Sequence, residues 1–182
     1  MILAFIGGIG SGKTLSMVRF MHEKYKCGRH IFTNFGIKFK GPENVTMLDM
    51  AFFSNYQKSG FNVIDSVVAI DEAHVFIDSR NAMSRKNKLF SKFVTQSRKR
   101  SVDLIYTTQD KNPDMFLHSG QVELRLRKLT DYIIFCQCLH KGSQVYIINS
   151  YCDSYGIKLK KSVFLGNDYF DCYDTNEIID IE

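Results

Sequence analysis

The segment Phe5–Thr14 constrains this chain more than any other stretch of its sequence. Its last eight residues, Gly-Gly-Ile-Gly-Ser-Gly-Lys-Thr, match the pattern G-x-x-x-x-G-K-[ST] at every fixed position. An apolar run, Ile2–Ile6, precedes the pattern, and a run with helical periodicity, Leu15–Tyr25, follows it. Glycines allow several backbone N–H groups to point at one anion, and the helix that follows adds the positive end of its dipole. The segment therefore predicts a phosphate-binding loop between a strand and a helix.

Two side chains of this loop have defined roles in that chemistry. We expect Lys13 to reach the β- and γ-phosphates of ATP, and the Thr14 hydroxyl to bind Mg²⁺. ATP and Mg²⁺ are therefore the predicted cofactors, and a glycine-rich turn with a surface lysine is the alternative. The predicted nucleotide-binding residues are consecutive: Gly8, Ile9, Gly10, Ser11, Gly12, Lys13, Thr14 and Leu15.

A second apolar run, Val63–Ile70, ends in two acids, Asp71 and Glu72. Its continuous apolar end is typical of a strand buried on both faces. In nucleotide sites the first acid after such a strand holds Mg²⁺, directly or through water, and the second polarises the water that attacks the γ-phosphate. We therefore predict Asp71 as a metal ligand and Glu72 as the catalytic base. Two solvated acids at a strand end are the alternative.

The residues Asp71-Glu72-Ala73-His74 also spell a helicase box. Helicases of that kind need two such domains in one chain, whereas 182 residues are enough for one. We therefore expect a single domain over residues 1–182, with its motifs in 1–136 and an extension at 150–182. His74 is expected to have a structural role.

A third apolar run, Val102–Gln109, ends in a polar pair, Thr108 and Gln109. In a parallel sheet built around the phosphate loop, this strand lies between the first strand and the strand before Asp71. Gln109 would then lie near the γ-phosphate, where a side-chain amide senses the terminal phosphate or helps to place the water. An ordinary amide at a strand end is the alternative.

Weaker patterns complete the expected secondary structure. Pro113 indicates a loop. Strands are expected at 30–33, 45–48, 132–136 and 145–148, and helices at 50–57 and 81–100.

Positive charge is concentrated in one segment of the chain. Between Ser79 and Ser101 there are eight basic residues and no acidic one, whereas Asn167–Glu182 has six acids and no base. Charges of both signs mix on a solubilising helix face, so this run favours contact with the phosphates of DNA or RNA, with a solvated face as the alternative. Few aromatic residues are interspersed, so stacking on unpaired bases is less favoured. The predicted DNA-binding residues are Arg85, Lys86, Lys88, Lys92, Arg98, Lys99 and Arg100.

Two arginines, Arg125 and Arg127, precede the strand expected at 132–136. In a ring ATPase an arginine at such a position can reach the neighbouring subunit's nucleotide and stabilise the charge of the transition state. Arg125 and Arg127 are the first candidates for this role, and Arg98 and Arg100 are the second. The sequence alone does not distinguish among them.

The five cysteines are scattered and have no C-x-x-C spacing. This pattern favours free thiols in a reducing compartment over a disulfide framework or a zinc site. The phosphate loop begins within seven residues of Met1, so we expect no signal peptide. The sequence has no apolar run of 18 residues, so we expect no membrane span.

Together these segments resemble the additional-strand P-loop ATPases, and within them the FtsK/HerA superfamily. The likeness is greatest to viral genome-packaging ATPases and extends to the zonula occludens toxin-like assembly ATPases of filamentous phages. It rests on Gly7–Thr14, Ala69–His74, Ser97–Gln109 and Arg125–Phe135.

The resemblance implies an α/β fold that is RecA-like, with a mainly parallel central sheet of order 5-1-4-3-2 and helices on both faces. It also implies a homo-oligomeric ring, a hexamer or pentamer, that couples ATP hydrolysis to the translocation of double-stranded DNA. Such a protein works in the host cytoplasm or in the virion. The acidic tail, 167–182, is then the expected contact for a capsid or membrane component.

Two other functions stay open. A small-molecule P-loop kinase has a similar size, but it needs neither a catalytic acid like Glu72 nor a polar sensor like Gln109. A nucleotide-gated assembly module of zonula occludens toxin-like type would bind ATP without pumping DNA. ATP turnover that duplex DNA stimulates would favour the motor.

Overall fold

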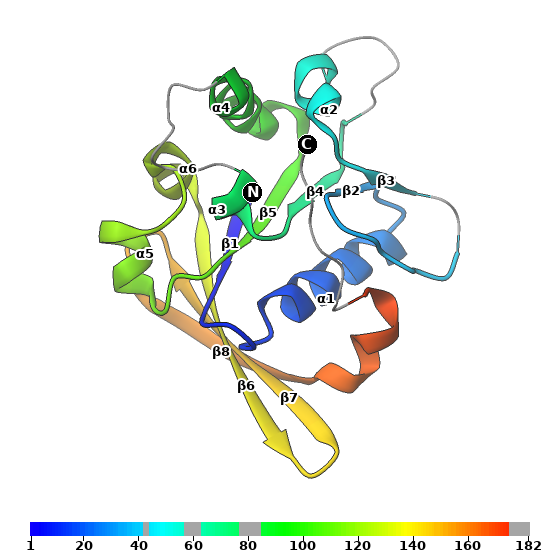
Figure 1. Cartoon of the computed structure of the whole chain (residues 1–182), viewed down its shortest axis with the longest axis vertical. Helices are drawn as coiled ribbons and strands as arrows, with labels where there is room; N and C mark the ends of the chain where they lie inside the picture. Colours follow the sequence, from blue (N-terminus) through cyan, green and yellow to red (C-terminus); the bar gives the residue numbers. More distant parts are fainter. Residues whose placement is uncertain (42–43, 57–62, 77–84, 175–182) are drawn as a thin grey trace.

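The described residues form one eight-stranded sheet with helices on both faces (Figure 1). The computed structural model describes residues 1–41, 44–56, 63–76 and 85–174. Across the sheet the strands follow the order β3-β2-β4-β5-β1-β6-β7-β8. The strands are β1 (Ile2–Ile6), β2 (Ile31–Thr33), β3 (Val45–Met47), β4 (Val67–Ile70), β5 (Asp103–Thr108), β6 (Tyr132–Lys141), β7 (Gln144–Asp153) and β8 (Lys158–Leu165).

Five of these strands have the predicted order. When β1, β2, β4, β5 and β6 are counted as strands one to five, the sheet reads 5-1-4-3-2, and each neighbouring pair is parallel. The predicted position of β5 between β1 and β4 is therefore confirmed. Three further strands widen the sheet: β3 pairs in parallel at one edge, and β7 and β8 pair in antiparallel at the other. The predicted α/β class with a mainly parallel sheet is confirmed.

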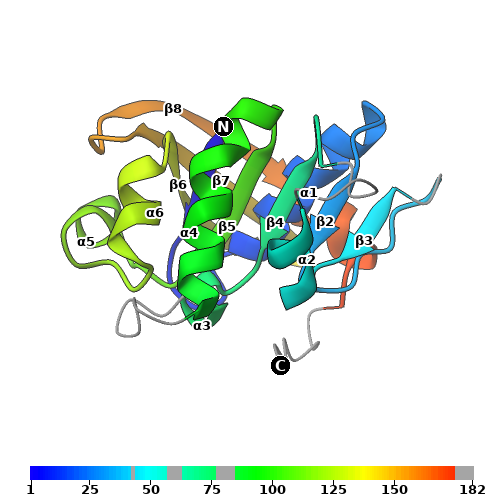
Figure 2. The same cartoon turned by 90° about the horizontal axis from the view of Figure 1, so that it is seen from above.

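Alternation along β1 explains why both faces of the sheet are covered. Ile2, Ala4 and Ile6 pack in one core with residues of α2, α4, α5 and α6, while Leu3 and Phe5 pack in a second core with α1. Successive side chains of a strand point to opposite faces, so an apolar run without polar positions fits a strand buried on both sides. Figure 2 shows α4 and α2 on one side of the sheet and α1 on the other. The helices are α1 (Lys13–Lys26), α2 (Met50–Asn55), α3 (Ala73–Phe76), α4 (Arg85–Ser97), α5 (Pro113–Ser119) and α6 (Leu124–Leu129), and the 3-10 helices are η2 (Arg98–Arg100) and η3 (Gly166–Cys172).

The structure adds elements that the sequence did not predict, among them α3, α5, α6, β8 and η3. Helix α5 begins where Pro113 indicated a loop, because Asn112 Oδ1 accepts a hydrogen bond from Met115 N–H at 2.8 Å and Pro113 fits the first helical turn. Helix α6 follows directly. Strand β8 was missed because exposed lysines interrupt its apolar alternation. The strands expected at 132–136 and 145–148 are longer than predicted and form the β6–β7 hairpin (Figure 1).

Other predicted elements are present with shifted bounds. The helix expected at 81–100 corresponds to α4 and η2, and residues 81–84 lie outside the described part of the chain. The strand expected at 63–70 begins only at Val67, because Asp65 turns the chain with a φ of 52°.

Two further expectations concern membrane spans and cysteines. Among the described helices, none has the length and hydropathy needed to cross a bilayer. All five cysteines are free thiols. Burial raises the pKa of Cys136 to about 12, so this thiol stays protonated at neutral pH.

Candidate nucleotide-binding site

The loop between β1 and α1 forms a tight cradle at the carboxyl end of the parallel strands. Gly10 and Gly12 have φ values of 71° and 84°, in the left-handed region that glycine adopts without strain. A Cβ atom at Gly12 would lie 2.4 Å from Ile147 Cδ1, so this position also lacks room for a side chain. Helix α1 has no acid in its first turn to neutralise the positive end of its dipole. The cradle therefore has the geometry and polarity that bind a phosphate.

Lys13 is held over this cradle. Its side chain is buried, and Nζ donates a hydrogen bond to the Gly8 carbonyl oxygen at 3.0 Å. A phosphate oxygen would be a stronger, charge-assisted partner for the same ammonium group. Among the described residues that line the cavity at this point, Lys13 is the one lysine or arginine.

Thr14 and Asp71 meet although 57 residues separate them in the sequence. The Thr14 hydroxyl lies 3.1 and 3.2 Å from the two carboxylate oxygens of Asp71, and the Thr107 hydroxyl donates to the same carboxylate. Burial raises the pKa of Asp71, and the hydrogen bonds from Thr107 and Thr14 only partly oppose this effect. A hydroxyl and a carboxylate are oxygen ligands of the kind that Mg²⁺ prefers. Thr14 and Asp71 therefore fit the predicted metal site.

Asn34 fixes the backbone at Asp71, a role that the sequence analysis missed. The Asp71 N–H donates to Asn34 Oδ1 at 2.8 Å, and Asn34 Nδ2 donates to the Asp71 carbonyl oxygen at 3.0 Å. Asn34 directly follows β2, which is the parallel neighbour of β4, so both residues reach the same edge of the sheet. A polar residue at the carboxyl end of a strand was the available signal.

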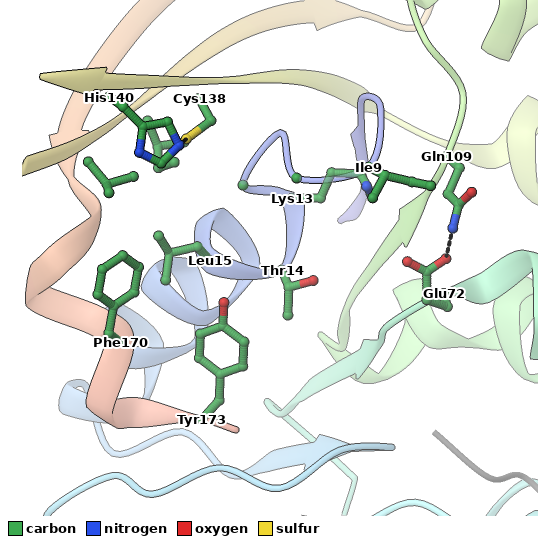
Figure 3. A pocket seen from close by; sticks show the side chains of 14 residues that line it. Ile9, Lys13, Thr14, Leu15, Glu72, Gln109, Cys138, His140, Phe170 and Tyr173 are labelled. Carbon is green, nitrogen blue, oxygen red and sulfur yellow. Dashed lines mark hydrogen bonds between the residues drawn. The ribbon is translucent and has the colours of Figure 1, made fainter. Parts of the chain in front are cut away.

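Glu72 has a constrained backbone next to this pair. Its φ of 50° lies in the left-handed region, and its N–H donates to Thr107 Oγ1 at 2.8 Å. Such a conformation costs about 1–3 kcal/mol and persists where the surroundings hold it. Gln109 Nε2 donates to Glu72 Oε2 at 3.1 Å (Figure 3), and His74 Nδ1 lies 3.2 Å from the same oxygen. The predicted base and the predicted sensor thus lie side by side, with His74 next to them.

A cavity of about 520 Å³ lies beside these groups, with Lys13, Thr14, Glu72 and Gln109 in its lining (Figure 3). Its volume lies within the range of small-molecule sites, roughly 300–1,000 Å³. Among the predicted nucleotide-binding residues outside the lining, Gly8 supplies the oxygen that Lys13 contacts, and Ser11 Oγ is buried without a hydrogen-bond partner among the described residues. The predicted site residues that line the cavity are Ile9, Gly10, Gly12, Lys13, Thr14, Leu15, Glu72 and Gln109.

The two candidate arginines lie outside this cavity and have different surroundings. The Arg127 guanidinium donates to the carbonyl oxygens of Val122, Phe116 and Leu117 at 2.9–3.1 Å, so it ties α6 to α5. Arg125 is exposed on α6 and lines a shallow groove with Lys128. Arg125 is therefore the one whose guanidinium is accessible to another molecule.

The predicted DNA-binding residues whose side chains the structure describes divide into two groups. Arg98 forms an ion pair with Asp131, and Arg100 lies over the ring of Tyr56 at 5.4 Å, so these two also stabilise the fold. The side chains of Arg85 and Lys86 lie outside the described part of the structure. Lys88, Lys92 and Lys99, on α4 and η2, are exposed, and so is Arg98.

A glycine cradle between a parallel strand and a helix, with a strand-end carboxylate beside the helix's first threonine, defines the P-loop NTPase fold. The model of the family described as Zonular occludens toxin (Zot) matches residues 1–114 of the chain. The chain belongs to this family, which confirms the resemblance to zonula occludens toxin-like proteins. A search among curated proteins found no match.

Several solved structures have a similar fold. The N-terminal domain of zonular occludens toxin from Neisseria meningitidis is 22% identical, with a TM-score of 0.63, and the match covers 95% of this chain and 98% of that chain. The genome packaging NTPase B204 from Sulfolobus turreted icosahedral virus 2, in complex with ATP-gammaS, is 14% identical, with a TM-score of 0.54 and coverage of 89% and 95%. A KaiC-like protein from Pyrococcus horikoshii OT3 is 14% identical, with a TM-score of 0.58 and coverage of 90% and 83%. These similarities show that the chain has the fold of the P-loop ATPases, a fold that a viral packaging enzyme also has.

Proposed function

We propose that this protein binds ATP with Mg²⁺ and hydrolyses it, and that residues 1–182 act as one ATPase domain. The contact between the Thr14 hydroxyl and Asp71 supports this most strongly, because it joins the predicted phosphate loop to the predicted metal acid. The cavity beside this contact has room for a nucleotide.

Each residue of the site has one task in this reaction. Lys13 and the N–H groups of the loop hold the triphosphate, while Thr14 and Asp71 would hold Mg²⁺, which would withdraw charge from the phosphate oxygens. Glu72 takes a proton from water as the water oxygen bonds to the γ-phosphorus and the bond to the β–γ bridging oxygen breaks, leaving ADP and phosphate. Gln109, which donates to Glu72, orients that water. This acid–amide pair favours hydrolysis over phosphate transfer to a small molecule.

A further cation beside Lys13 and Mg²⁺ would stabilise the charge that develops on the γ-phosphate. Lys13 is the one lysine or arginine among the described lining residues, so we propose that a neighbouring copy in a homo-oligomeric ring, a hexamer or pentamer, supplies an arginine. Arg125 suits this role because it is exposed, whereas Arg127 is bound to three carbonyl oxygens.

DNA is the partner that the basic surface supports. Lys88, Lys92 and Lys99 are exposed on α4 and η2, and the similar structure of B204 is described as a genome packaging NTPase. We therefore propose translocation of duplex DNA, in the host cytoplasm or the virion. The family match over residues 1–114 favours a second candidate, a nucleotide-gated module that assembles a partner machine, whose acidic tail contacts a capsid or membrane component.

The two candidates differ in how DNA affects turnover. A motor should hydrolyse ATP faster with duplex DNA and should form a larger assembly in ATP, measured by light scattering. Replacing Lys88, Lys92 and Lys99 with Gln should lower the slope of log affinity against log salt by up to about three, since each phosphate contact contributes about 0.9. The matched control replaces three exposed lysines elsewhere, Lys141, Lys158 and Lys161. An unchanged slope for the α4 variant, or turnover insensitive to DNA, would favour the assembly module.

A further inference from the structure

The cavity extends well beyond the groups that would bind phosphate. Figure 3 shows Glu72 and Gln109 at one end and Phe170 and His140 at the other, with Thr14 between them. We call the end at Phe170 and His140 the hairpin end, because the β6–β7 hairpin and the 3-10 helix η3 form it. Its side chains are those of Leu15, Cys138, His140, Val145, Ile147, Phe170 and Tyr173.

We propose that the hairpin end is the base site of the nucleotide, and that it holds a purine by packing and stacking without selecting between adenine and guanine. This inference rests on the proposed nucleotide binding. A triphosphate in the cradle leaves its sugar and base to follow the cavity away from Glu72, and the cavity continues past Leu15 to Phe170 (Figure 3).

The floor of the hairpin end is built by close packing on two glycines. A Cβ at Gly12 would lie 2.4 Å from Ile147 Cδ1, and a Cβ at Gly166 would lie 2.7 Å from Leu15 Cδ2. These contacts join the phosphate loop to β7 and α1 to η3. Leu15 and Ile147 are therefore fixed apolar surfaces next to the place of the phosphates.

The turn η3 is anchored by contacts outside the cavity. The ring of Tyr169 packs against His22 and Phe164, with centroids 5.8 and 5.7 Å apart. The Lys38 N–H donates to the Cys172 carbonyl oxygen at 2.7 Å. Phe170, which directly follows Tyr169 in the sequence, points into the cavity and is 40% exposed (Figure 3). A large aromatic side chain on an anchored turn is thus partly exposed in the cavity, as a stacking surface requires.

The polar side-chain groups at this end are the Cys138 thiol, the His140 ring and the Tyr173 hydroxyl. The Cys138 thiol and His140 Nε2 lie 3.4 Å from each other, and the backbones of β6 and β7 pair with each other along the hairpin. Among the described lining residues of the hairpin end, none is an acid or an amide that could accept from guanine N1–H and N2–H₂. Strong selection between ligands requires buried polar groups that the wrong ligand leaves unpaired. The described lining therefore has apolar surface for a base, and it lacks the acid or amide that pairs with guanine.

Calorimetry with ATP, GTP and inorganic tripolyphosphate, each with Mg²⁺, separates the base site from the phosphate site. Wild type should bind ATP and GTP with affinities within about fivefold of each other. Phe170→Ala should weaken both roughly tenfold, the usual scale for losing one base–aromatic stack, and should leave tripolyphosphate affinity unchanged. Phe170→Tyr should retain affinity because it keeps the ring. The control Tyr155→Ala removes an aromatic side chain that is 82% exposed and outside the cavity, and should change nothing.

Three results would overturn the base site: ATP affinity unchanged in Phe170→Ala, an equal loss for tripolyphosphate, or a large preference for one purine. If wild type binds ATP and tripolyphosphate, and Phe170→Ala binds both with unchanged affinity, the base site is refuted but the proposed function is not. Wild type that binds neither would also refute the proposed function.

Discussion

Replacing Gly12 with Ala tests the packing of the phosphate loop. The φ of 84° at Gly12 costs a residue with a Cβ about 1–2 kcal/mol. The new methyl group would also overlap Ile147 Cδ1, 2.4 Å away, and overpacking of this kind costs about 1–3 kcal/mol. Together Gly12→Ala should lower the free energy of unfolding by about 2–5 kcal/mol, measured by urea denaturation. Gly8→Ala is the matched control, because its Cβ would meet nothing within 4 Å.

The two costs can be separated with a second substitution. Ile147→Val removes the Cδ1 atom that a Cβ at Gly12 would meet, at an expected cost of about 0.5–1.5 kcal/mol by itself. In the Ile147→Val background, Gly12→Ala should cost less than in wild type, since only the backbone strain and weaker contacts remain. An equal cost in both backgrounds would refute the close contact between the loop and β7.

Two further predictions concern carboxylates whose pKa values the fold shifts. Because burial raises the pKa of Asp71, its ionised form weakens the folded state at pH values above the ordinary carboxyl range. Asp71→Asn should therefore raise the Tm of the nucleotide-free protein by about 2–4 °C at pH 7, for a gain of about 1 kcal/mol, and a lower Tm would contradict this. Burial by itself would raise the pKa of Asp103, but hydrogen bonds from the Met1 amino group and Arg29 outweigh it, so the pKa is lowered. The stability from this carboxylate is complete above the ordinary carboxyl pKa and is lost as the pH falls through the lowered folded value. Between pH 5 and pH 3, urea unfolding should thus show a smaller loss of stability for Asp103→Asn than for wild type. Equal losses would show that Asp103 does not cause the acid sensitivity of the fold.

Local patterns were enough to predict the centre of the site. The phosphate loop, the strand before Asp71 and the strand before Gln109 each show their role in a few adjacent residues, and parallel pairing brings their ends together. The sequence therefore predicted that Thr14 and Asp71 would meet.

Residues that act through tertiary contacts gave no such pattern. Asn34 lies 37 residues from Asp71, and Thr107 resembles any β-branched residue of a buried strand. Arg127 could not be told from Arg125, because the carbonyl oxygens that bind it belong to a turn and to a helix that the sequence did not predict. Phe170 faces the cavity only because η3 folds back onto α1, beyond the residues that the recognised motifs cover.

The central claim is that the phosphate loop and the acids after β4 act on one triphosphate. Single-turnover hydrolysis of ATP by Glu72→Gln, with ATP affinity measured alongside and Glu23→Gln as the surface control, tests it most directly. We predict that Glu72→Gln binds ATP as wild type does while hydrolysis slows about 100-fold or more. Hydrolysis at the wild-type rate would contradict the account.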